Sequence, residues 1–221
     1  MIFFSRIKRF FSFWLQEFRP LNQTIFNTKP ATVPTENKGR VVAKTLSGPD
    51  IDFMYYNHFK KPGLCPICHN LIKMIPDMNY KVKGARGRDI LCTNDDFDIV
   101  SQKFKDFCDE RHYEGLTFLQ FPKSPNYYYF RPNLIYPIDY QRTQPIFTNK
   151  RDCCGQYDEV LTGINYKEKN FTPPSDDFIY RSYDMYGYKF RKSPLIIIGL
   201  TTYKEMKKAK LKGLCFKDVY E

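Results

Sequence analysis

Two pairs of cysteines are the residues of this sequence whose types and spacing could do chemistry. The first pair, Cys65 and Cys68, forms a C-x-x-C motif, in which a tight turn can present two thiolates to one tetrahedral metal ion. Lysine, proline and glycine precede the motif, which is typical of a zinc-ribbon knuckle, whereas a thioredoxin-like redox motif would begin a helix after a strand. One such motif supplies only half of a metal site.

The second pair, Cys153 and Cys154, precedes Gly155 and is the candidate for the other half. A regular knuckle of the form C-x-x-C-G would need a cysteine at position 151, where the sequence has Arg151. Successive side chains diverge, so adjacent cysteines are poor joint ligands of one ion. We predict one structural zinc ion, with a degenerate site without metal as the alternative. The predicted ligands are Cys65, Cys68, Cys154 and, as the fourth, Cys153 or His69.

The other three cysteines, Cys92, Cys108 and Cys215, lie within apolar patterns and are expected to be buried small hydrophobic residues. The total of seven cysteines is odd. The N-terminus is no secretory signal, because basic residues interrupt its apolar positions and no small-residue cleavage site follows. Together these features favour a cytoplasmic protein whose cysteines act as thiols or metal ligands.

Signatures of catalysis are missing from the sequence. It has three histidines and no P-loop, H-E-x-x-H or G-x-S-x-G motif. We therefore predict that the protein is not an enzyme and has neither catalytic nor organic-cofactor-binding residues. An apolar share of 42% with 17% aromatic residues excludes a disordered chain, and no apolar run is long enough for a membrane span.

An internal repeat indicates how the chain folds. Residues 97–118 and 195–216 both contain a short apolar run, a polar stretch with apolar residues on one helical face, and a closing Gly-Leu-x-Phe. We interpret each as strand, helix, helix-ending glycine and strand, with chance similarity as the alternative. The expected helices are 102–112 and 201–210. The expected strands are Ile99–Ser101, Leu116–Phe118, Leu195–Ile198 and Leu214–Phe216.

The predicted fold class is α+β: a mixed sheet with two repeated strand-helix-strand units and a small zinc-ribbon-like insert at about 60–92. An N-terminal arm, 1–40, would combine an amphipathic helix with a proline-containing linker, and 41–221 would form the α+β domain. Further expected strands are Arg40–Leu46, Ile51–Tyr56, Tyr127–Phe130 and Leu134–Tyr140. The pair Phe178–Tyr183 and Tyr186–Phe190 is predicted to form a hairpin around Asp184–Gly187.

Charge is distributed unevenly. The net charge is +11, and residues 1–92 hold 15 basic and 6 acidic residues, a net of +9. Acidic residues gather instead on the expected helix 102–112 and its flanks, which could recognise a basic partner, although a solvated helix face would look the same. The candidate partner-binding residues are Asp106, Asp109 and Glu110.

The order of these motifs resembles a bacterial group, the double-CxxCG-motif proteins related to immunity proteins of contact-dependent or polymorphic toxin systems. The resemblance covers roughly 60–221 and runs from Cys-Pro-x-Cys through Gly-Leu-x-Phe, Tyr-Tyr-Tyr-Phe and Cys-Gly to Leu-Ile-Ile-Ile-Gly and Lys-Gly-Leu-x-Phe. The chain departs from the pattern at His69 and Arg151. The resemblance implies a cytoplasmic protein that binds and neutralises one cognate toxin protein.

Two other partners remain open. A basic, aromatic-rich protein with a zinc-ribbon knuckle could bind nucleic acid, which is the alternative function. The expected helix within residues 1–18, aromatic on one face and basic on the other, could contact a membrane surface, although packing onto the body of the protein would explain the same pattern.

Overall fold

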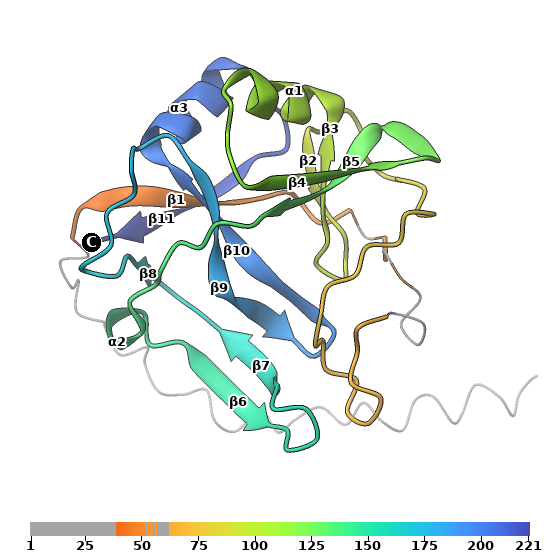
Figure 1. Ribbon diagram of the computed structural model, residues 1–221, viewed down its shortest axis with the longest axis vertical. Coiled ribbons are helices and arrows are strands. Elements are labelled where there is room, and N and C mark those ends of the chain that lie inside the picture. The colour runs from red at the N-terminus through yellow and green to blue at the C-terminus, as the bar shows by residue number, and fades with distance from the viewer. Residues whose placement is uncertain (1–38, 52, 55, 57–61) are drawn as a thin grey trace, which may run out of the picture. The chain divides into compact units, whose positions relative to one another are not determined.

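The protein is described from a computed structural model, which describes residues 39–51, 53–54, 56 and 62–221 (Figure 1). These residues belong to one unit that begins at Lys38 and ends at Glu221. The amphipathic helix expected within residues 1–18 and the linker that follows it lie outside the described residues. Among the helices described, none is long and apolar enough to cross a membrane.

Two β-sheets carry the fold, which is mostly β with few short helices (Figure 1). The larger sheet is curled and mixed, because its last pair of strands is parallel and the others are antiparallel. Its strands, in spatial order, are β6 (Ile146–Lys150), β7 (Tyr157–Leu161), β9 (Ile179–Tyr188), β10 (Arg191–Gly199), β1 (Val41–Ser47), β11 (Cys215–Tyr220) and β8 (Asn165–Tyr166). The smaller sheet consists of β2 (Ile90–Cys92), β3 (Asp98–Ser101), β5 (Ser124–Pro132) and β4 (Leu116–Phe121).

The two predicted strand-helix-strand units are present. The first consists of β3, α1 (Gln102–Glu110) and β4, and the second of β10, α3 (Leu200–Lys208) and β11. In each unit the two strands are parallel and enclose a third, antiparallel strand, which is β5 in the first and β1 in the second. The units lie in different sheets, so the expectation of one shared sheet was wrong. The short helix α2 (Tyr140–Thr143) belongs to neither unit.

The units share a core, which explains why two sheets form instead of one. Phe104 and Phe107 of α1 and Met206 of α3 are buried in one cluster with Val100 of the smaller sheet and Ile198 of the larger. The apolar faces of both helices thus contribute to one core that also contains residues of both sheets. Burial of apolar area is the main stabilising contribution to such a core.

The helices end differently from the prediction. The left-handed residues that terminate α1 and α3 are His112 (φ +55°) and Lys210 (φ +52°), not the glycines. The next residue in each unit donates its N–H back into the helix, Tyr113 to the carbonyl of Cys108 and Leu211 to that of Met206. This is the hydrogen bond of a Schellman cap, and the following glycine starts the turn into the strand.

Three strand predictions were wrong. The region 134–140 forms only isolated bridges at Ile135 and Ile138, since Pro137 offers no N–H to a ladder. Around Ile51 the only bridge is at Asp50, and the described residues up to Tyr56 form no strand. The predicted hairpin is instead the single strand β9, which turns into β10 at Lys189 and Phe190. Gly187 lies within this strand, where a Cβ atom would come 2.1 Å from the carbonyl oxygen of Arg191.

Candidate metal centre

The two cysteine pairs come together from distant parts of the chain. Cys65 and Cys68 lie in a turn that is closed by the bridge between Leu64 and Leu71. Cys153 and Cys154 lie in the loop that joins β6 to β7. The Sγ atoms of all four cysteines lie within 4.8 Å of one another.

The two turns have the same backbone hydrogen bonds. In the first, the N–H of His69 donates to the carbonyl of Cys65 at 3.0 Å, and the N–H of Cys65 donates to the carbonyl of Asn70 at 2.8 Å. In the second, Gly155 donates to Arg151 at 2.7 Å and Arg151 donates to Gln156 at 2.8 Å. Position 151 therefore corresponds to position 65, and Cys154 corresponds to Cys68.

His69 takes the place that glycine has in a C-x-x-C-G knuckle. Its φ is +58°, a left-handed conformation that Gly155 adopts in the second turn at +70°. A left-handed backbone suits glycine and is tolerated by few other residues. His69 is exposed and is not among the residues whose ligand atoms converge, so the histidine alternative for the fourth ligand finds no support.

The fourth cysteine lies two positions later than a regular knuckle would place it. Arg151 occupies the first ligand position of the second turn, and Cys153 reaches the cluster instead, with its Sγ 3.7 Å from that of Cys65. The Sγ atoms of Cys68 and Cys154 are 3.5 Å apart. The expected divergence of the adjacent cysteines is therefore overcome by the tight turn at Cys153 and Cys154.

These distances fit a zinc ion. Zinc binds thiolates at about 2.3 Å in a tetrahedron, which places neighbouring sulfur atoms about 3.8 Å apart. Four cysteine ligands complete the coordination sphere, so the arrangement suits a structural site without an open position for substrate. The chemistry that such an ion would supply is the cross-linking of the insert to the β6–β7 hairpin.

The thiols of the cluster do not ionise alike. Burial opposes ionisation of Cys68, but the backbone and side-chain N–H groups of Asn70 outweigh it and lower the pKa to about 6. Hydrogen bonding to Cys68 and burial raise the pKa of Cys153 to about 12, and burial raises that of Cys154. The Cys68 thiolate thus forms readily, and a bound cation would favour the thiolate form of Cys153 and Cys154.

A buried polar network lies next to Cys68. Asp158 is 3% exposed and accepts a hydrogen bond from Nδ2 of Asn70 at 2.9 Å and another from Nε of Arg151 at 2.8 Å. The second Asp158 oxygen forms an ion pair with the same guanidinium, which lowers the pKa of Asp158 to about 2. Arg151 therefore has a structural role where a regular knuckle has a cysteine, because its guanidinium binds the buried Asp158 and holds the second turn in place.

Lys192 of β10 completes this network and was not identified from the sequence. Its Nζ donates to Oδ1 of Asn70 at 3.3 Å and to the backbone carbonyl of Tyr157. Burial lowers the pKa of Lys192, while Asp158, Cys154 and Cys68 raise it. The alternation of buried residues along β10 was the available signal, because Lys192 shares its face with the buried Ile196 and Ile198.

The three remaining cysteines lie apart from the cluster. Cys108 is buried in the core shared by the two units, as predicted, and its pKa is raised by that burial. Cys92 is partly buried at the end of β2. Cys215 is exposed at the start of β11, so its predicted burial was wrong.

Substitution of the displaced ligand gives the first prediction. Cys153→Ser should reduce bound zinc to a fraction of an equivalent or weaken its retention against a chelator by at least about 10-fold, because a thiolate ligand is replaced by a neutral hydroxyl. Zinc content by elemental analysis measures this. Cys215→Ser is the matched control and should retain the zinc of the wild type; equal zinc content in both variants would show that Cys153 is not a ligand.

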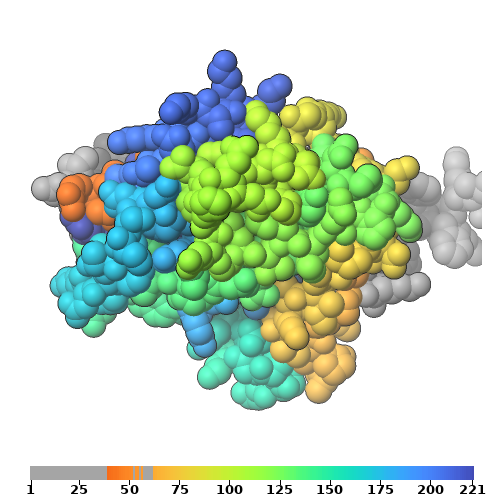
Figure 2. All heavy atoms as spheres, turned by 45° about the horizontal axis from the view of Figure 1, so that its top comes forward, coloured from red at the N-terminus to blue at the C-terminus, as the bar shows by residue number. Residues whose placement is uncertain are grey.

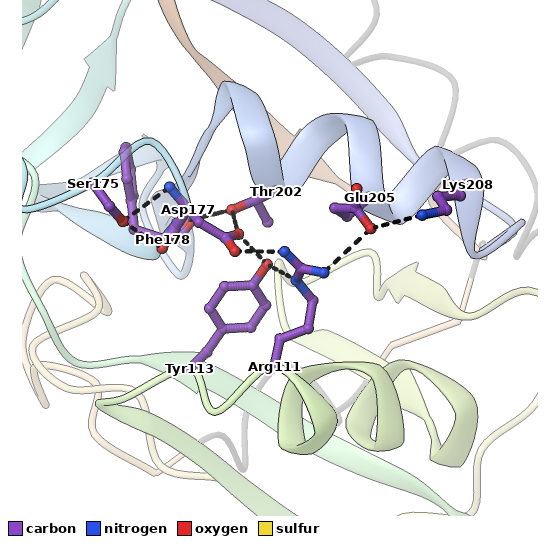
Figure 3. Close-up of polar contacts among 8 residues, drawn as sticks. All are labelled: Arg111, Tyr113, Ser175, Asp177, Phe178, Thr202, Glu205 and Lys208. Carbon is purple, nitrogen blue, oxygen red and sulfur yellow. Dashed lines mark hydrogen bonds and ion pairs between the residues drawn. The ribbon is translucent and has the colours of Figure 1, made fainter.

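A second polar cluster joins the end of α1 to α3 and so connects the two repeat units (Figure 3). Arg111, which follows α1, forms ion pairs with Asp177 at 2.6 Å and with Glu205 of α3 at 3.2 Å. Asp177 also accepts hydrogen bonds from the hydroxyls of Tyr113 and Thr202. A cavity of about 230 Å³ lies beside these groups, whose charges are already paired with one another.

This cluster predicts a pH dependence of stability. Its hydrogen bonds lower the pKa of Asp177 against the opposing effect of burial. The charged carboxylate therefore stabilises the fold above the ordinary pKa of 3.8, and that contribution is lost progressively as the pH falls through the lower pKa of the folded state. Asp177→Asn should cost about 1.5–3 kcal/mol at pH 7 and less at pH 3. Thermal melts at both pH values measure it, and an equal cost at both would contradict the assignment.

Comparison with known proteins adds no relative. No protein-family model, no curated protein and no solved structure matches the chain.

Proposed function

We propose that the chain is an immunity protein, which binds a cognate bacterial toxin in the cytoplasm and neutralises it. The observation that carries the proposal is the pair of matching cysteine turns, whose backbone hydrogen bonds correspond residue by residue. This pair is the three-dimensional counterpart of the double motif on which the resemblance rests. What this resemblance implies, the binding of a toxin, is the content of the proposal.

In this proposal the metal centre stabilises the protein and the outer surface binds the partner. Four cysteine ligands fill a zinc tetrahedron, so the ion would bind no substrate and would act on stability alone. A preformed, rigid surface favours tight binding, since little conformational freedom is lost on association. The shared core beneath α1 and α3 provides such a support.

The exposed face of α1 is the surface that we assign to the toxin. Asp106, Asp109 and Glu110 are exposed on it, with Asp106 accepting a hydrogen bond from Gln102 and Asp109 paired with Lys105. Figure 2 shows this helix, in yellow-green, at the front of the molecule and α3, in blue, behind it. A negative patch of this kind accelerates association with a basic protein, as toxins that act on nucleic acids often are.

The proposal is tested by protection from a toxin encoded beside the gene for this chain. Bacteria that express the neighbouring toxin intracellularly should survive only when this protein is co-expressed, and the two proteins should co-purify as a complex. Survival that depends on this protein supports the immunity function. If the chain protects against no neighbouring toxin and binds none of them, the immunity function is wrong.

A second candidate, nucleic-acid binding, is favoured by one specific observation. Five lysines are exposed along α3 and the turn after it, and the side chain of Arg88 lies beside this turn at Gly213. Clustered lysines bind phosphate backbones with an affinity that falls steeply with salt. The lysines are Lys204, Lys207, Lys208, Lys210 and Lys212. Fluorescence anisotropy with labelled RNA and DNA at two salt concentrations tests this candidate.

A further inference from the structure

Within the part of the chain that the structure describes, no acidic side chain forms an ion pair or a hydrogen bond with the buried Lys192, which lies near Cys68 and Cys154. Lys192 is 2% exposed, and its two hydrogen-bond acceptors, the side chain of Asn70 and the carbonyl of Tyr157, are neutral. Burial of an ammonium group is costly unless a negative charge compensates it. The carboxylate of Asp158, whose charge acts on Lys192, is already paired with Arg151.

The four cysteines can supply this negative charge as thiolates, and a bound divalent ion would bring all four of them to the thiolate form. Four neutral thiols carry no charge, whereas four thiolates on a divalent ion leave a net charge of about −2. Arg151 and Lys192 are cationic and Asp158 is anionic, so the surrounding network is positive by one charge. The network is therefore opposite in sign to a metal–tetrathiolate centre, whose negative charge is larger than that of a single Cys68 thiolate.

Asn70 connects the lysine to the cysteines with a fixed orientation. Its Nδ2 donates to Oδ1 of Asp158 at 2.9 Å and approaches Sγ of Cys68 at 3.5 Å, while its Oδ1 accepts from Lys192. Asn70 is completely buried, so these three partners determine which way the amide points. Its N–H groups consequently face the sulfur, which favours the thiolate form of Cys68.

We propose that Lys192 and Asn70 are positioning residues of a divalent metal–tetrathiolate centre: Asn70 orients Cys68, and Lys192 provides the compensating charge. This inference rests on the proposed zinc site and extends it to the layer behind the ligands. Groups behind metal ligands commonly contribute 10- to 100-fold to metal affinity. The lysine should therefore act on affinity for the metal and not only on stability.

The test measures zinc affinity by competition with a chromophoric chelator, in the full chain, for the wild type, Lys192→Met and Lys150→Met. Methionine keeps the length of the lysine side chain and removes its charge. Lys150 is the matched control, because it is exposed at the end of β6 next to the second cysteine turn. We expect zinc affinity to fall about 10- to 100-fold in Lys192→Met and to change less than about 3-fold in Lys150→Met.

A second variant covers the case in which Lys192→Met does not fold. Arg151→Gln removes a cation of the same network from a side chain that is 43% exposed, and it should weaken zinc binding about 3- to 10-fold. Cobalt substitution adds a readout that stability does not affect, because the sulfur-to-cobalt absorption band should shift when Asn70→Ala removes the N–H groups near Cys68. Wild-type affinity in both charge variants would overturn the inference, whereas a wild-type protein without zinc would overturn the metal site itself.

Discussion

Removal of zinc is expected to lower the melting temperature of the protein by about 10 °C. The ion would join Cys65 to Cys153, which are 88 positions apart in the sequence. The chain-entropy relation for a cross-link of that span gives about 4–5 kcal/mol. For a protein of this size each kcal/mol corresponds to about 2–4 °C. Differential scanning calorimetry with and without a high-affinity chelator, under reducing conditions, measures the change.

Two cysteine variants are the controls for this experiment. Cys65→Ser should melt at the lower temperature from the start and should not respond to the chelator, because it lacks a ligand. Cys215→Ser, whose thiol is exposed and outside the cluster, should respond as the wild type does. A chelator that leaves the melting temperature of zinc-loaded wild-type protein unchanged would contradict a stabilising metal.

Reversal of the acidic helix is expected to abolish protection from the cognate toxin. In the triple variant Asp106→Lys, Asp109→Lys, Glu110→Lys, three exposed negative charges become positive, so a basic toxin should associate about 10-fold or more slowly. The fold should persist, because lysines in the last turns of a helix interact favourably with its dipole. Cell survival and association rates by surface plasmon resonance provide the two measurements.

The neighbouring helix supplies a matched control of opposite charge. Lys204→Glu, Lys207→Glu, Lys208→Glu changes the same number of exposed charges on α3. Protection should persist in this variant if the toxin binds α1. The reverse pattern, with protection lost only in the α3 variant, would place the toxin on the basic face and would show that the acidic helix is not the binding surface.

The sequence predicted the repeat units because their apolar periodicity and turn residues are local signals. The strands and helices within 97–118 and 195–216 are present to within a few residues. The separation of the units into two sheets could not be predicted in this way. It depends on Phe104, Phe107 and Met206 meeting in one core, and such contacts have no local signature.

The metal centre likewise has one part that local sequence signals predicted and another that depends on tertiary contacts. The spacing of Cys65 and Cys68 and the position of Cys154 before Gly155 identified three of the four clustered cysteines. The choice between Cys153 and His69 as the fourth ligand could not be made from the sequence. It depends on the tight turn that Arg151 holds in place through its ion pair with Asp158. Lys192 was missed since a lysine in a strand usually faces solvent, and only its partners Asn70 and Tyr157 reveal its role.

The zinc content of the protein tests the central claim, that the two cysteine turns form one metal site, most directly. The informative variant is Arg151→Cys combined with Cys153→Ser, which restores a regular C-x-x-C-G knuckle in the second turn. Protein purified without chelator should contain one zinc per chain by elemental analysis, both in the wild type and in this double variant. Less than about a tenth of an equivalent in the wild type would contradict a zinc site, since a closed set of four cysteines should retain the ion through purification.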